Sequence, residues 1–255
     1  MPTISIDEQA LFYQSPNPTS QVPAIVFVHG AGGSSHKWFN QLAYLAKSYR
    51  PIAIDLPGHA QSPGQGCSNI GDYRERIKSF AEALNLGPFI LAGHSMGGAI
   101  TLDFACQYPQ RLLGMALIST GAKLGVSPDF LEILRQGKNT TNLREMAYSA
   151  KTSDEIFREG EKDYKLTSNL VRFNDFLACN AFDIRSSLPE LSIPTLIICG
   201  DEDILTPVKY ANYLQANLPQ ATTEIITQAG HMAMIEQPAA VNSALENFLK
   251  TLINH

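Results

Sequence analysis

The chain has 255 residues, of which 44% are hydrophobic and 17% charged, and its formal net charge at pH 7 is -5. This length fits one α/β domain, or one such domain with a modest insertion. No apolar run reaches the roughly 18 residues of a membrane span, and the acidic balance offers no basic face to nucleic acid, so we expect a small-molecule partner.

The cysteines and the first residues bear on location and metal content. Cys67, Cys106, Cys179 and Cys199 include no C-x-x-C pair and no Cys/His cluster at zinc spacing, so no metal site is expected. Residues 1–10 lack the basic start and the apolar stretch of a secretory signal, which favours a cytoplasmic location. The oligomeric state is left open.

Short apolar segments alternate with amphipathic segments along most of the chain. An opening hairpin is expected around a turn at Asp7-Glu8. All-apolar strands between helices predict a doubly wound, mostly parallel sheet of eight strands, covered on both faces. The expected strands are 3–6, 10–13, 24–28, 51–54, 89–92, 112–118, 195–199 and 223–226. The expected helices are 36–47, 72–84, 97–108, 208–217 and 239–252.

One segment breaks this alternation. Residues 122–187 contain no convincing strand, and they carry 20 of the 43 charged residues, ten of each sign. Balanced charge at helical spacing is typical of solvated helix faces. We therefore predict a core domain of residues 1–121 and 188–255, with residues 122–187 forming a helical insertion that lies over the sheet.

The run Gly93-His94-Ser95-Met96-Gly97 is a G-x-S-x-G motif between a predicted strand and a predicted helix. In a nucleophile elbow the serine occupies a tight, strained turn, so the residues two positions on either side must be small. The alternative is a tight turn in an ordinary Rossmann-like sheet, with no chemistry attached. If the serine is a nucleophile, it needs a base, and the base needs an acid.

His231 is the preferred base, because it stands in a short glycine-containing loop after the last predicted strand. A loop histidine without a role is the alternative. The preferred acid is Asp203, because it is the fourth residue of the Gly-x-x-Asp turn that follows the strand predicted at 195–199. Asp201, in the same turn, is the fallback. The alternative is that these carboxylates cap the next helix or face solvent.

The developing negative charge on a substrate oxygen needs hydrogen-bond donors. The amide of Met96 directly follows the serine, and the amide of Ala31 lies in the glycine-rich run 29–33. This run is alternatively a phosphate cradle, but it lacks both the Lys-Ser/Thr ending of a P-loop and the G-x-G-x-x-G spacing. Three residues close to these motifs in the sequence are candidate substrate-binding residues: Trp38, Met232 and Met234. Apolar residues at such positions are equally typical of the hydrophobic core.

Five motifs in this order resemble the α/β-hydrolase superfamily from end to end. They are HGAGG at 29–33, DLPGHAQS at 55–62, GHSMGG at 93–98, GDED at 200–203 and GH at 230–231. The resemblance implies a helical cap before the strand that bears the acid. A serine nucleophile disfavours the chemistry of haloalkane dehalogenases and epoxide hydrolases, whose nucleophile is aspartate.

The expected function is cleavage of a small carboxylic ester through an acyl-enzyme, carried out by Ser95, His231 and Asp203 without a metal or organic cofactor. The same triad is compatible with a thioester, lactone, amide or carbon-carbon bond, because the fold does not choose among them. A receptor for a small ligand with a vestigial hydrolase site is the alternative from another class.

Overall fold

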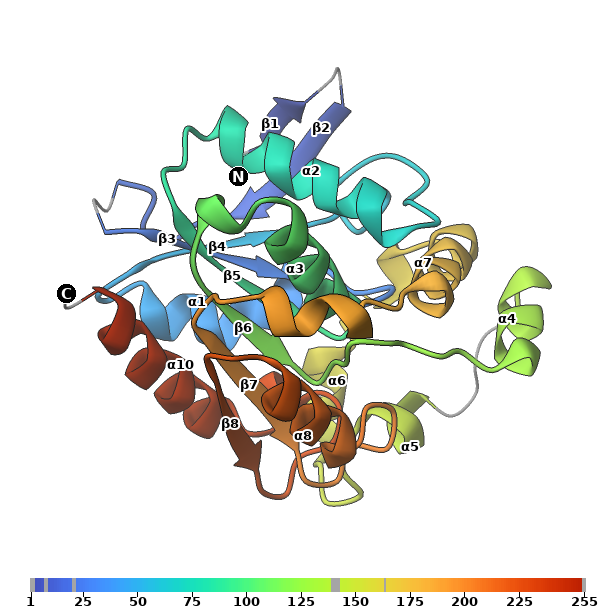
Figure 1. The fold of residues 1–255 in the computed structure, drawn as a ribbon. Coiled ribbons are helices and arrows are strands. Elements are labelled where there is room, and N and C mark those ends of the chain that lie inside the picture. Colours follow the sequence, from blue (N-terminus) through green and yellow to red (C-terminus); the bar gives the residue numbers. More distant parts are fainter. Residues whose placement is uncertain (1–2, 7–8, 20–21, 139–142, 163, 254–255) are drawn as a thin grey trace.

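The structure is a computed structural model, and it describes residues 3–6, 9–19, 22–138, 143–162 and 164–253. One eight-stranded sheet forms its centre, in the order β1-β2-β4-β3-β5-β6-β7-β8 (Figure 1). The strands are β1 (Thr3–Ile6), β2 (Gln9–Gln14), β3 (Ala24–Val28), β4 (Arg50–Ile54), β5 (Phe89–His94), β6 (Leu112–Ile118), β7 (Thr195–Gly200) and β8 (Ala221–Ile226).

The pairing confirms the predicted fold class. β1 and β2 pair antiparallel, β2 pairs antiparallel with β4, and every other pair of neighbouring strands is parallel. The turn predicted at Asp7-Glu8 lies outside the described residues. Parallel order brings the carboxyl ends of β3, β5, β7 and β8 to one edge of the sheet, which is where ligands bind in open α/β folds.

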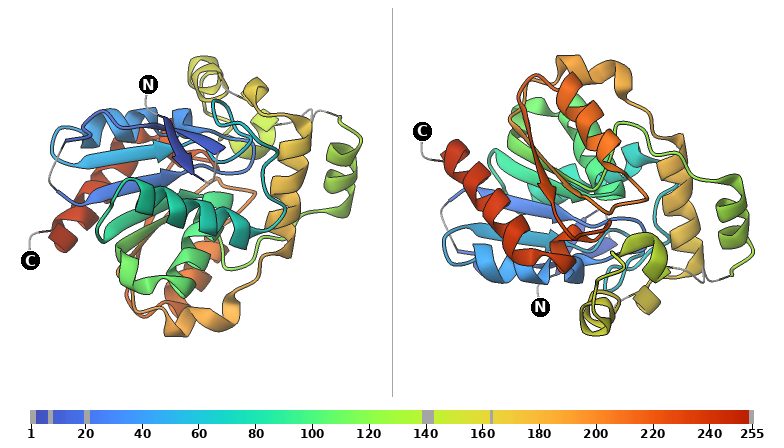
Figure 2. Two further views of the ribbon diagram at one scale, coloured as in Figure 1. Left: turned by 90° about the horizontal axis from the view of Figure 1, so that it is seen from above. Right: turned by 90° about the horizontal axis from the view of Figure 1, so that it is seen from below.

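Helices cover both faces of the sheet (Figure 2). α1 packs against α10 on one face, while α2 and α3 pack together on the other, where α8 contacts β7 and β8. The bounds of these helices are α1 (Phe39–Leu45), α2 (Ile70–Ala83), α3 (Met96–Gln107), α8 (Val208–Asn217) and α10 (Pro238–Ile253). Shorter helical elements are η1 (Ser35–Trp38), η2 (Pro109–Arg111) and α9 (Ala233–Glu236).

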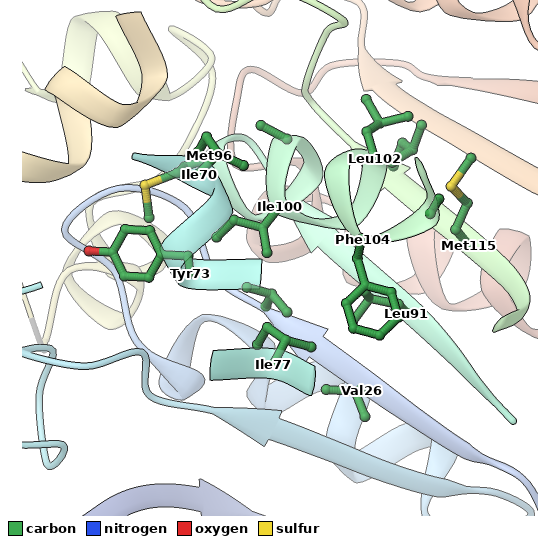
Figure 3. Close-up of a cluster of buried hydrophobic side chains, with 14 of the residues drawn as sticks. Val26, Ile70, Tyr73, Ile77, Leu91, Met96, Ile100, Leu102, Phe104 and Met115 are labelled. Carbon is green, nitrogen blue, oxygen red and sulfur yellow. The ribbon is translucent and has the colours of Figure 1, made fainter. Parts of the chain in front are cut away.

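All five residues of β3 are buried because helices lie on both sides of it. Val26 and Val28 belong to the apolar layer under α2 and α3, and Ile25 and Phe27 belong to the layer under α1 and α10. This period-two alternation is the geometry of an extended chain. Figure 3 shows the first layer, in which Phe104 of α3 stands beside the strands.

The chain between β6 and β7 is helical. It contains α4 (Pro128–Arg135), α5 (Leu143–Ala147), α6 (Asp154–Gly160), η3 (Tyr164–Leu166), α7 (Asn169–Ala181) and η4 (Arg185–Glu190). α4 and α7 lie side by side at one edge of the molecule, with α4 outermost (Figure 2). We call residues 122–187 the insertion; its division from the core as a separate cap stays a prediction.

Both ends of the insertion meet at one point. Lys123 and Asp183 form an isolated antiparallel bridge, and Lys123 Nζ lies 3.2 Å from Asp183 Oδ2. The insertion therefore leaves the core and returns to it at the same place. Across the ranges given above, no helix combines the length and apolar character that spanning a bilayer requires.

The core layer of Figure 3 carries the first prediction. Leu91 of β5 is fully buried, so Leu91→Ala should lower the free energy of unfolding by about 2 to 5 kcal/mol through lost burial and a cavity. Urea unfolding measures this loss. Leu170→Ala is the matched control, because Leu170 is 53% exposed, and it should change the value by less than about 0.5 kcal/mol. Equal losses would contradict this packing.

Candidate active site

Ser95 occupies a strained backbone conformation, with φ 53° and ψ -115°, between β5 and α3. Its N–H donates to Ile118 O at 2.9 Å, and its carbonyl accepts from Thr120 Oγ1 at 2.7 Å and from Gly98 N at 2.9 Å. Such a conformation persists where surrounding contacts over-determine it. The end of strand β6 and Thr120, two residues beyond it, therefore hold the serine in place.

The elbow has no room for side chains on either side of the serine. A Cβ on Gly93 would lie 2.0 Å from Gly97 O, and a Cβ on Gly97 would lie 2.3 Å from Val28 O. Real Cβ atoms do not come this close to backbone atoms. The helix thus begins directly against β3 and β5, and its first amides, which have no partners within the helix, are next to Ser95.

Asp203 and His231 form a buried pair. His231 Nδ1–H donates to Asp203 Oδ2 at 2.9 Å, and Thr206 Oγ1 donates to the same oxygen at 2.8 Å. The other oxygen accepts from the amides of Leu205 and Thr206, both at 2.9 Å. Burial alone would raise the pKa of Asp203, but the charge of His231 and these hydrogen bonds lower it below its ordinary value. Asp201, the alternative acid, is exposed.

His94 is a site residue that the sequence reasoning missed. Its Nε2–H donates to His231 O at 2.9 Å, and the two rings are 4.7 Å apart. Burial and the charge of His231 lower the pKa of His94 to about 3, so this imidazole is neutral near pH 7. The place of His94 as the last residue of β5, at the functional edge of the sheet, was the available signal.

Glu236 holds the loop that carries His231. Its Oε1 accepts from the amide of Gly230 at 2.9 Å, and its Oε2 accepts from the amide of Ser149 at 2.8 Å and from Thr152 Oγ1 at 2.5 Å. Ser149 and Thr152 belong to the insertion. One buried carboxylate therefore fastens the histidine loop of the core to the insertion.

Residues 30–33 form a tight turn beside the serine. The amide of Gly33 donates to Gly30 O at 3.1 Å, and Gly32 has a φ of +66°, which favours glycine at the third position of such a turn. A Cβ on Gly30 would lie 3.1 Å from Ser95 Cβ, so the turn packs directly on the serine. We call residues 30–33 the oxyanion loop, after their predicted role.

A buried carboxylate of α7 lies behind the oxyanion loop. Asp175 Oδ2 accepts from the amide of Gly32 and from His59 Nε2, both at 2.8 Å, and Oδ1 accepts from the hydroxyl of Tyr73 at 2.5 Å. His59 Nδ1 also faces an acceptor, Pro57 O at 3.1 Å. Burial lowers the pKa of His59, but the charge and hydrogen bond of Asp175 outweigh it, so the net shift is upward. Both ring nitrogens of His59 thus face acceptors, an arrangement that a protonated, positively charged imidazole satisfies.

The pKa of His29 shifts in the opposite direction. Its Nε2 accepts from the amide of Leu56 at 3.1 Å, and its Nδ1–H donates to Gly30 O at 2.8 Å. Burial and the charge of His59, whose ring is 4.7 Å away, hold the pKa of His29 well below its ordinary value. A neutral His29 thus supports the first carbonyl of the oxyanion loop.

A cavity of about 510 Å³ lies between these loops and the insertion. Ser95, His231, Ala31 and His94 line it from the core. Apolar side chains line much of the remainder: Leu124, Val126, Phe130, Met146, Phe176 and Leu205. Its volume falls within the usual range for small-molecule sites. Within the described part of the chain, no three His, Cys, Asp or Glu side chains are grouped as a metal ion would require.

Some of the predicted site residues line this cavity, and others do not. Ser95, His231, Ala31 and Met232 line it. Asp203 lies behind His231, and Met96 begins α3 immediately after Ser95. The other two predicted substrate contacts are core residues: Trp38 is fully buried with its ring 4.8 Å from that of Phe27, and Met234 is fully buried in the same apolar layer.

Comparison with known proteins agrees with this geometry. The sequence profile of the Alpha/beta hydrolase family matches residues 25–244. The chain belongs to the α/β hydrolase family. It is 23% identical to the monoacylglycerol lipase ABHD6 of Mus musculus over 259 residues, which cover 91% of this chain and 76% of that protein.

Solved structures of other α/β hydrolases have the same fold. The enol-lactonase of Burkholderia xenovorans LB400 superposes with a TM-score of 0.85 at 22% identity, covering 98% of this chain and 100% of that one. The thermophilic esterase of Thermogutta terrifontis superposes with a TM-score of 0.86 at 23% identity, covering 99% and 98%. Membership of the α/β hydrolase family supports a hydrolase, and these likenesses show the shared fold.

The pair of His59 and Asp175 predicts a pH dependence of stability for this α/β hydrolase. Because folding raises the pKa of His59, its protonation stabilises the fold fully below the unfolded pKa of about 6.5, and this contribution is lost as the pH rises through the folded pKa. The stability difference between wild type and His59→Gln should therefore be larger at about pH 6 than at about pH 9.

Urea unfolding at the two pH values measures that difference. Glutamine is the matched replacement, because it keeps a donor for Asp175 and does not titrate. Pairing each variant with wild type at the same pH cancels the effects of other titrating groups. A difference that stays constant with pH would contradict a charged His59.

Proposed function

We propose that the protein is a serine esterase, in which Ser95 attacks the carbonyl of a carboxylic ester, His231 is the general base and Asp203 orients the imidazole. The observation that carries the proposal is the buried hydrogen bond of 2.9 Å between Asp203 and His231, beside a cavity that a strained serine also lines. A base held by an acid next to a serine is the arrangement that serine hydrolases require.

The hydrogen bond to Asp203 fixes the tautomer of the base. With its proton on Nδ1, neutral His231 has an unprotonated Nε2 that accepts the hydroxyl proton of Ser95 during attack. The imidazolium then returns this proton to the leaving alcohol. Water deacylates the enzyme by the same route in reverse, and the buried Asp203 carboxylate stabilises the transient positive charge in both halves of the reaction.

Two amides are proposed to stabilise the oxyanion. Met96 N–H is at the beginning of α3, where the helix dipole adds positive potential. Ala31 N–H comes from the tight turn that packs on Ser95. Each such donor is typically worth about 10² to 10³ in rate, because it acts on charge that develops in the transition state.

The cavity supports an uncharged ester with an apolar acyl chain. Lys37 and Glu161 are the two side chains of opposite formal charge among its lining residues, and Lys37 Nζ lies 3.1 Å from Glu161 Oε1. Among the lining residues that the structure describes, this pairing balances the formal charge, which disfavours a charged substrate. Phe130 and Phe176, whose rings are 4.8 Å apart, offer an apolar surface for the acyl chain.

The first test of this proposal removes the nucleophile. Ser95→Ala should lower kcat on a p-nitrophenyl ester by at least about 10³-fold, because the variant lacks the hydroxyl proposed to form the acyl-enzyme. It should also abolish covalent labelling by a fluorophosphonate. Ser48→Ala is the matched control, because Ser48 is exposed on the surface and should keep both properties.

The outcomes separate the candidate functions. Full esterase activity in Ser95→Ala would refute the proposed nucleophile. Saturable ligand binding by the wild type without turnover or covalent labelling would instead favour a receptor. Hydrolysis of lactones or thioesters with similar efficiency would keep the triad and change the assigned bond.

A second test concerns the acyl chain. From acetyl to hexanoyl p-nitrophenyl esters, kcat/KM should rise, by up to about fourfold for each methylene that enters the apolar cavity. Val126→Asp should flatten this series by placing a charge on the cavity wall, while Val126→Ala, the matched control, should keep it rising. A flat series in the wild type would place the acyl chain outside the cavity.

A further inference from the structure

Asp175 is a fully buried carboxylate that takes no direct part in the proposed reaction. A buried charge costs several kcal/mol unless charged and hydrogen-bonding partners compensate for it. Here three donors surround it, and they come from three separate parts of the core: the oxyanion loop through Gly32, the loop after β4 through His59, and α2 through Tyr73. Asp175 itself belongs to the insertion.

Of these donors, the amide of Gly32 bears directly on the reaction. It belongs to the peptide that follows Ala31, whose own amide is the proposed oxyanion donor. The central peptide of a four-residue turn is the one that can rotate while the closing hydrogen bond remains intact. The bond of 2.8 Å from Gly32 N to Asp175 Oδ2 fixes this peptide.

A second residue of α7 reinforces the contact. Arg172 lies one helical turn before Asp175, and a Cβ on Gly32 would be 3.1 Å from Arg172 Cγ. The guanidinium of Arg172 is itself placed over the ring of Tyr164, at 3.8 Å from its centroid. The helix thus covers the oxyanion loop from behind at two points, one polar and one apolar.

We propose that Asp175 is a positioning residue for catalysis, which holds the oxyanion loop in its working geometry from the insertion, with His59 as its counter-ion. This inference rests on the proposed function for its catalytic part. It makes the rate of acyl transfer depend on how α7 is seated, although α7 contributes none of the proposed reacting groups.

The proposal differs from a purely structural role in what it predicts for the kinetics. Oxyanion donors act in the transition state, so a misplaced loop lowers kcat and changes KM little. Loss of stability alone lowers the amount of folded enzyme and leaves kcat per folded molecule unchanged. The affinity for a trifluoromethyl ketone, which forms a tetrahedral adduct with the serine, should therefore fall together with kcat.

The experiment compares Asp175→Asn with Val171→Ala. Asparagine keeps the size of the side chain and one acceptor oxygen but removes the charge. Val171 is on the same helix and is also buried, yet it packs near Gly58 and Gly66 rather than on the oxyanion loop. Both variants should lose stability to urea, which makes the valine variant a control for destabilisation.

Three readouts are expected to separate the two variants. In Asp175→Asn, kcat per folded enzyme should fall by about tenfold to a hundredfold, a part of what one oxyanion donor is worth, with KM within about twofold. Affinity for the trifluoromethyl ketone should fall by a similar factor. Amide hydrogen exchange should accelerate in the peptide that contains residues 30–33. Val171→Ala should change none of these three.

Each outcome supports or overturns the inference. An unchanged kcat and unchanged exchange at residues 30–33 in Asp175→Asn would overturn it, leaving a structural role. If wild-type turnover does not depend on Ser95, the proposed function fails, while the exchange measurement still tests whether Asp175 orders the loop. Asp175→Glu, which keeps the charge but moves it by one methylene, replaces the asparagine variant if that protein does not fold.

Discussion

The close approach of α3 to β3 and β5 organises this molecule. Gly97 lies against the backbone of Val28, and Gly93 lies against Gly97, with no space for a Cβ at either position. Because the helix begins so close to the sheet, Ser95 must turn through a left-handed conformation, and the residues that follow β3 come directly beside it. The parallel strand order then brings the loops after β7 and β8 to the same edge. The candidate site follows from this contact.

Loops at such an edge have amides without strand or helix partners, and buried amides need acceptors. Buried carboxylates provide several of them here. Asp203 accepts from the turn after β7, Glu236 from the histidine loop and Asp175 from the oxyanion loop. Asp55 accepts from the amide of Ser35, the first residue of η1, at 2.7 Å, although burial raises the pKa of Asp55. By accepting hydrogen bonds from these amides, the carboxylates hold the irregular loops in defined conformations.

Much of the fold could be predicted from the sequence, because strands buried on both faces appear as short apolar runs, and a serine between two glycines marks the elbow. The candidate acid was harder to assign. Asp201 and Asp203 differ by two positions on one turn, and a local pattern does not show which carboxylate faces His231. Trp38 was expected to contact substrate, but its side chain is buried and its ring packs against that of Phe27.

The supporting network could not be predicted, because its partners are far apart in the sequence. Asp175 lies 143 positions from Gly32 and 116 positions from His59, so no spacing or periodicity connects them. Balanced charge in the insertion indicated solvated helix faces. Asp175 and Arg172 are buried exceptions within that pattern. A single sequence does not distinguish such a carboxylate from its exposed neighbours.

The hydrogen bonds between Glu236 and the insertion have a consequence for protein engineering. Replacing residues 122–187 with the corresponding segment of another hydrolase would remove the amide of Ser149 and the hydroxyl of Thr152, both of which Glu236 binds. It would also remove the carboxylate that receives the amide of Gly32. Such a chimera would have a new pocket lining, but its oxyanion loop and its histidine loop would each lack hydrogen bonds to the insertion. A segment grafted to change specificity must therefore also supply hydrogen-bonding groups for these two loops.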